Sequence, residues 1–122
     1  MEQSERPIVG VSIAYRLNLL GFLAGDSLDP EDKNAGLQDQ RLALEWVQRH
    51  ITQFGGDPEQ VTIAGESAGG ASVVMHMVAF GGTKPALFKR VIAQSIGYGP
   101  MATDEQANNA FGVNLFCTAF EL

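Results

Sequence analysis

Cysteine is nearly absent from this 122-residue chain, which contains only Cys117. A lone cysteine excludes a disulfide within the chain and a cysteine-based zinc site. We therefore expect a buried or free thiol, or a disulfide to a cysteine outside this sequence. Histidine is also scarce, at two residues. No H-E-x-x-H motif is present and the two histidines lack metal-ligand spacing, so we expect no metal and no cofactor.

Positive charge and long apolar runs are also in short supply. Eight Lys and Arg against fourteen Asp and Glu give a net charge of −6, with no basic cluster. This balance argues against binding to nucleic acid or to an anionic membrane surface. The longest uncharged stretch, residues 67–83, is shorter than the roughly 20 apolar residues of a membrane span. Residues 1–6 do not resemble a signal peptide, and the sequence leaves the localisation open.

The remaining composition, with 45% hydrophobic residues, is that of an ordinary globular protein. Apolar, β-branched runs predict strands at residues 8–15, 60–65 and 90–95. Helical spacing of apolar residues and flanking glycines predict helices at residues 37–54, 68–80 and 105–120. Residues 16–33 are rich in Gly, Asp and Pro and are predicted to form a loop. Trp46 and Phe54 lie on or beside an apolar helix face, which predicts that they pack in the core.

Strands that alternate with helices predict an α/β fold with parallel strands. Three strands are few for such a sheet, because parallel strands are normally buried between neighbours and helices. The chain also starts almost at a strand and stops in a helix-like segment. We therefore expect an incomplete sheet, with residues 1–122 forming a fragment of a single larger domain.

The main chemical motif is GESAGG at residues 65–70, which contains G-x-S-x-G at Gly65, Ser67 and Gly69. This pattern signals a nucleophile when it follows a strand and opens a helix, as is predicted here. The sharp turn would place Ser67 in a strained conformation with its hydroxyl exposed, and the glycines would avoid collisions there. The Ala68 amide would lie at the helix N-terminus, where partial positive charge stabilises an oxyanion. We therefore predict that Ser67 is a nucleophile.

The chain resembles the type-B carboxylesterase family, the cholinesterase and fungal-lipase branch of the α/β-hydrolases. The resemblance spans residues 8–97 and is carried by the blocks YRLNLLGFL, NAGLQDQRLAL and WVQRHITQFGGDP, followed by the serine motif. It implies a partial α/β-hydrolase fold and a serine esterase or lipase acting on small-molecule or lipid esters. Ser67 would form an acyl-enzyme and Ala68 would supply an oxyanion-hole amide. Glu66 matches the residue that precedes the nucleophile in the family, where it is not the acid of the triad.

The resemblance to the family implies smaller roles for several other residues. Asp39 and Arg41 match the family pattern and are expected to be structural. Ser95 matches a serine that often lies near the active-site base, but Ile96 replaces the usual glycine. His76 is nine residues beyond Ser67, or roughly 13 Å along a helix, too far for a base. His50 ends the preceding helix and is not expected to be the base either.

The glycine-rich oxyanion loop, the triad acid and the triad histidine of the family are not found in this sequence. We therefore expect the chain by itself to have little or no esterase activity. Two alternatives remain open at this point. One is a non-catalytic, cholinesterase-like adhesion module, against which the intact serine motif argues. The other is a non-functional truncated product, for which exposed strand edges would favour aggregation.

Overall fold

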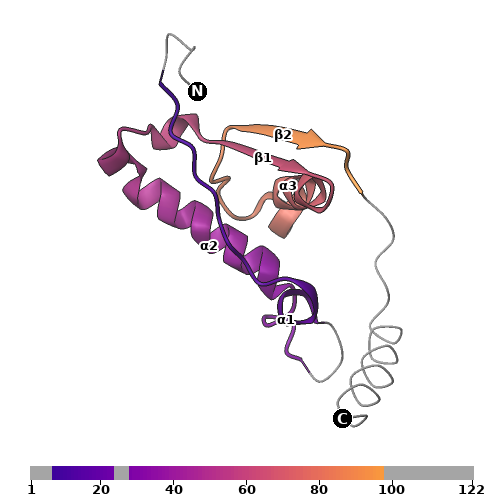
Figure 1. Cartoon of the computed structure of the whole chain (residues 1–122). Helices are drawn as coiled ribbons and strands as arrows, with labels where there is room; N and C mark the ends of the chain where they lie inside the picture. The colour runs from indigo at the N-terminus through magenta and orange to yellow at the C-terminus, as the bar shows by residue number, and fades with distance from the viewer. Residues whose placement is uncertain (1–6, 24–27, 98–122) are drawn as a thin grey trace, which may run out of the picture. The chain divides into compact units, whose positions relative to one another are not determined.

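The computed structural model of the chain describes residues 7–23 and 28–97 (Figure 1). Backbone contacts divide the chain into two compact units. The described part of the first unit comprises residues 7–14 and 39–97, and that of the second comprises residues 15–23 and 28–38. The predicted helix at residues 105–120 and Cys117 lie outside the described residues.

The first unit contains a β–α–β arrangement that carries the serine motif. Strand β1 (Thr62–Glu66) pairs in parallel with strand β2 (Arg90–Gln94), in register from Thr62 opposite Arg90 to Glu66 opposite Gln94. Helix α3 (Ala68–Val78) begins directly after β1 and contacts both strands (Figure 1). The strands predicted at residues 60–65 and 90–95 are thereby confirmed, as is the coarse class of a partial α/β fold with a small parallel sheet.

The two strands bury alternate residues, as expected when one face of a sheet is covered. Ile63 and Gly65 of β1 and Val91 and Ala93 of β2 are partly buried, whereas their neighbours are exposed. On α3 the buried residues are Gly70, Ala71 and Val73. Small residues on the helix therefore allow it to lie close to the strands. Helix α3 continues into a 3₁₀ turn, η3 (Ala79–Gly82).

Helix α2 (Ala35–His50) begins in the second unit and continues into the first. It tightens into a 3₁₀ turn, η1 (Ile51–Phe54), and ends at Gly55, whose φ of 81° is left-handed. A second 3₁₀ turn, η2 (Pro58–Gln60), leads to β1. The helix predicted at residues 37–54 and its glycine stop are confirmed, because glycine adopts this conformation without a side-chain clash.

The packing of α2 differs from the prediction for its aromatic residues. Val47 and Ile51 are buried, at 7% and 5% exposure, whereas Trp46 and Phe54 are exposed. The two aromatic rings instead pack against each other, with centroids 5.8 Å apart. Core packing of Trp46 and Phe54 was therefore a wrong expectation. Both lie beside the narrow buried stripe of the helix rather than on it.

The strand predicted at residues 8–15 is not present among the described residues. This stretch carries no regular secondary structure, and Ile8, Val11 and Ile13 are exposed. A strand exists only where a neighbour accepts its hydrogen bonds. In the described part of the chain, β1 and β2 pair only with each other. The β-branched, apolar sequence of residues 8–15 is therefore not sufficient by itself to form a strand.

The second unit contains a short helix where the sequence predicted only a loop. Helix α1 (Asn18–Phe22) includes the buried Gly21, and a side chain there would collide with the Arg16 carbonyl. In the same unit the Gln38 side-chain amide donates to the carbonyls of Glu31, at 2.6 Å, and Lys33, at 2.9 Å. Within residues 7–23 and 28–97, no helix combines the length and apolarity needed to cross a membrane.

We predict that Ile51→Ala destabilises the protein far more than Phe54→Ala. Ile51 is buried at 5% exposure and Phe54 is 60% exposed, one turn further on. Loss of a buried isoleucine costs about 2–5 kcal/mol through lost burial and a residual cavity. Urea unfolding of both variants checks this expectation. Equal losses of unfolding free energy would contradict the packing described for η1.

Candidate active site

Ser67 occupies the sharp turn between β1 and α3. Its backbone φ of 54° and ψ of −115° are strained for a residue with a side chain, at a cost of roughly 1–3 kcal/mol. Two hydrogen bonds hold this conformation. The Ser67 N–H donates to the Gln94 carbonyl at 3.0 Å, and the Ser67 carbonyl accepts from the Ala71 N–H at 2.9 Å. The serine is thus tied both to the neighbouring strand and to the helix it opens.

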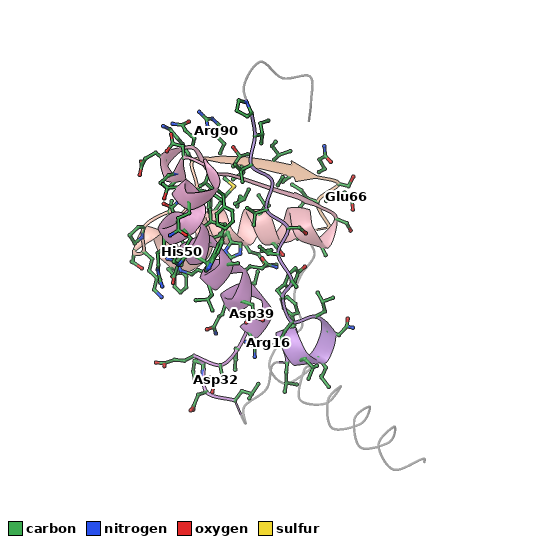
Figure 2. All side chains as sticks on the ribbon, turned by 60° about the vertical axis from the view of Figure 1, so that its left-hand side comes forward. Arg16, Asp32, Asp39, His50, Glu66 and Arg90 are labelled. Carbon is green, nitrogen blue, oxygen red and sulfur yellow. The ribbon has the colours of Figure 1, made fainter. Side chains whose placement is uncertain are left out.

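The hydroxyl of Ser67 is available for chemistry. Serine at a helix N-cap usually accepts a hydrogen bond from the first turn, but the Ser67 side chain makes no such bond. The residue is exposed, as are its neighbours Glu66 and Ala68. Glu66 stands at the end of β1, where the chain turns into α3 (Figure 2). The N–H groups of the first turn lack intrahelical acceptors, so a negative oxygen beside the hydroxyl would meet donors and the helix dipole.

Two glycines make the turn sterically possible. A Cβ on Gly65 would collide with the backbone of Gly69, including its Cα at 2.9 Å. A Cβ on Gly70 would lie 2.7 Å from the Gln94 carbonyl oxygen. In contrast, a Cβ on Gly69 would meet nothing within 4 Å. The expected collision is therefore present at Gly65 but not at Gly69, and Gly70 is the second position with no room for a side chain.

Ser95 lies at the same edge of the sheet as Ser67. Each follows its strand directly, and the last paired residues are Glu66 and Gln94. Ser95 is also exposed and has a positive φ of 48°. The structure thus brings Ser95 to the end of the sheet where the serine motif lies.

The recorded partners of the two histidines are residues other than Ser67. His76 is on α3, nine residues from Ser67, and its Nε2 lies 2.9 Å from the Gln40 Oε1. His50 is the last residue of α2, and its ring packs 5.1 Å from that of Trp46. Among the described residues no group of three or more His, Cys, Asp or Glu is placed to hold a metal ion.

Asp39 and Arg41 were expected to be structural. The Arg41 Nε lies 3.5 Å from a Glu45 carboxylate oxygen, and its guanidinium lies 5.1 Å from the centre of the Phe80 ring. The ion pair lies within α2, and the contact with Phe80 joins α2 to the 3₁₀ turn η3. Asp39 is half-buried on α2 and also has an interaction partner.

A polar network around the buried Gln40 was missed from the sequence. Gln40 is buried at 5% exposure, although glutamine is polar. Its amide joins Ser72 and His76 of α3. The available signal was its position, because Gln40, Leu44, Val47 and Ile51 follow the spacing of one helix face. A polar residue on an apolar stripe indicates a buried partner.

Burial and a nearby charge lower the pKa of His76. Burial disfavours the charged imidazolium, and the positive charge of Arg41 adds to the effect, so the pKa lies below the ordinary value of 6.5. The ring is therefore neutral at pH 7. A neutral ring with a proton on Nε2 is the form that donates to the Gln40 carbonyl oxygen.

Comparison with known proteins identifies the family. Residues 2–119 match the model of the carboxylesterase family. The chain is 48% identical over 101 residues to carboxylesterase patB of Penicillium expansum, covering 81% of this chain and 18% of that protein. It is 44% identical over 119 residues to lipase 5 of Diutina rugosa, covering 93% and 21%. It is 45% identical over 103 residues to acetylcholinesterase of Electrophorus electricus, covering 84% and 16%.

This chain belongs to the carboxylesterase family. The match covers nearly all of its length, and relatives from both the esterase and the lipase groups agree. The chain spans about a fifth or less of the length of these curated relatives. The resemblance read from the sequence blocks is thereby confirmed, and a purely adhesive role is not favoured.

We predict opposite effects for alanine at the two glycines of the motif. Gly65→Ala forces the backbone of the turn apart, because its Cβ collides with Gly69. Gly69→Ala meets open space in α3 and improves helix propensity by about 1 kcal/mol. The melting temperatures of the two variants check this. A Gly65→Ala variant as stable as Gly69→Ala would contradict the close approach.

We also predict a pH dependence of stability that His76 causes. The unfolded chain takes up a proton on this ring near pH 6.5, whereas the folded state resists it until a lower pH. The unfolded state therefore binds more protons below pH 6.5, and stability falls as the pH drops through that range. Unfolding measured from pH 7.5 to pH 5 should show a smaller loss in His76→Gln than in the wild type. An unchanged slope in the variant would disprove this assignment.

Proposed function

We propose that the protein is a serine carboxylic ester hydrolase in which Ser67 is the nucleophile. The carrying observation is the strained Ser67 turn between β1 and α3, whose hydroxyl is exposed and forms no cap. A serine used only for structure would be expected to cap the helix it opens. Membership of a family that includes carboxylesterases and lipases supports the same reaction.

In the proposed reaction the Ser67 Oγ attacks the carbonyl carbon of an ester while its proton passes to a general base. The Ala68 N–H stabilises the oxyanion that forms, helped by the helix dipole. Loss of the alcohol leaves an acyl group on Ser67, and water then releases the acid. His76 pairs with Gln40 and His50 packs against Trp46, which supports the proposal that the base comes from elsewhere in the protein.

We further propose that the β1–α3–β2 arrangement is part of an α/β-hydrolase sheet. Parallel strands that flank a helix with a serine at its start fit this fold. The location of Glu66 and Ser95 at the same edge supports roles near the site for both. Glu66 would act on the local field and Ser95 beside the base, and neither would be the nucleophile.

The proposed substrates are small-molecule or lipid esters. This class follows from the names of the relatives, which include carboxylesterases, lipases and an acetylcholinesterase. A serine hydrolase of this kind needs no cofactor, because the hydroxyl supplies the nucleophile and the helix supplies the positive field.

A fluorophosphonate probe tests the nucleophile directly. In the full-length protein we expect one probe per molecule on the peptide that contains Ser67, identified by mass spectrometry. Ser67→Ala should abolish labelling, because the attacking oxygen is gone. Ser12→Ala is the matched control, since Ser12 is an exposed serine in another segment, and it should label as the wild type does. Absence of labelling at Ser67 in the folded wild type would refute the proposal.

A further inference from the structure

A row of hydrogen bonds between α2 and α3 runs from His76 through Gln40 and Ser72 to the carbonyl of Ala68. The His76 Nε2 lies 2.9 Å from the Gln40 Oε1, the Gln40 Nε2 lies 3.3 Å from the Ser72 Oγ, and the Ser72 Oγ lies 3.0 Å from the Ala68 carbonyl oxygen. We call this row the Gln40 relay. It reaches the first turn of α3, next to the residue that we propose as nucleophile.

The chemistry of the groups fixes the direction of the relay. The Ala68 carbonyl only accepts, so the Ser72 O–H must donate to it. The Ser72 oxygen then accepts from the Gln40 amide N–H, and the Gln40 carbonyl oxygen accepts from the His76 Nε2–H. The three hydrogen bonds of the relay therefore all run in the same direction, from His76 toward the Ala68 carbonyl. In the described residues no buried side-chain nitrogen or oxygen lacks a partner.

We propose that Gln40 is a positioning residue for Ser67. This inference rests on the proposed function of Ser67 and adds to it a device on a different helix. Gln40 fixes the rotation of the Ser72 hydroxyl, and that hydroxyl holds the Ala68–Gly69 peptide in the first helical turn. Through Gln40, helix α2 thus stabilises the first turn of α3, which directly follows the strained Ser67. Gln40 itself touches neither the hydroxyl nor a substrate.

Burial explains why a glutamine is suited to this position. An apolar side chain of similar size would fill the space without the desolvation cost of a buried amide. It would leave the Ser72 oxygen without its donor and the His76 donor without its acceptor on α2. The amide supplies one acceptor and one donor in a fixed plane, so it sets both neighbours at once.

The first test compares Gln40→Leu and Ser72→Ala with Val47→Ala in the full-length protein. Val47 is buried on the same helix, at 7% exposure, and provides a matched loss of stability outside the relay. For the two relay variants we expect the rate of fluorophosphonate labelling at Ser67 and kcat for a p-nitrophenyl ester to fall roughly tenfold, because small displacements of a reacting group are costly. KM should stay near the wild-type value. Val47→Ala should lower the melting temperature without changing the labelling rate.

A second variant separates positioning from folding. In Gln40→Glu the new carboxylate still accepts from His76, which keeps α2 tied to α3. It lacks the N–H that faces Ser72, so the Ser72 O–H turns toward the carboxylate and leaves the Ala68 carbonyl. We expect this variant to remain folded near pH 6, yet to label as slowly as Ser72→Ala. The Gln40→Leu, Ser72→Ala double variant should label no more slowly than either single variant, because one chain of contacts is broken.

The outcomes distinguish this inference from the proposed function. If wild-type Ser67 is not labelled at all, the proposed function fails and the inference fails with it. If wild-type Ser67 is labelled and the relay variants label at the wild-type rate, only the inference is overturned. It is equally overturned if the labelling rates of all variants, Val47→Ala included, follow their melting temperatures alone.

Discussion

The hydrogen bond from the Ser67 N–H to the Gln94 carbonyl, 3.0 Å long, is the contact on which the β1–α3–β2 arrangement and its serine turn depend. It extends the pairing of β1 and β2 by one residue beyond the last strand pair, so the chain has no room for a loop before α3 begins. The same carbonyl lies where a side chain on Gly70 would be. The positive φ of Ser67 and the bare backbone of Gly70 are two consequences of one close approach.

The sequence predicted the elements whose cause is local. The run QVTIAG predicted β1, the apolar stretch after Ser67 predicted α3, and the glycine after Phe54 predicted the end of the preceding helix. Residues 8–15 failed as a strand because a strand requires a partner, which propensity cannot supply. Helix α1 was missed because its five residues carry little periodic signal and depend on the fit of Gly21 against the Arg16 carbonyl.

The site was predictable to a similar degree. The G-x-S-x-G pattern identified Ser67 and the steric need at Gly65, because both arise within the turn itself. It treated Gly69 as equivalent to Gly65 and gave no role to Gly70, since the requirement at Gly70 comes from Gln94 on a strand far along the chain. Gln40 was hidden for the same reason. Its amide is explained only by Ser72 and His76 on another helix.

The buried amide of Gln40 couples the hydrogen bonds around it, so that their contributions to stability are not independent. The core beneath α3 is small, with Val47, Ile51, Ala71 and Val73 buried, and Gln40 is the buried polar residue among them. Each hydrogen bond of the relay contributes only about 1 kcal/mol net, but loss of Ser72 or His76 would leave the buried Gln40 amide with an unpaired group, which is costly. The three side chains therefore act as a unit. A substitution at Gln40 should therefore change the backbone conformation most readily at the strained turn of Ser67.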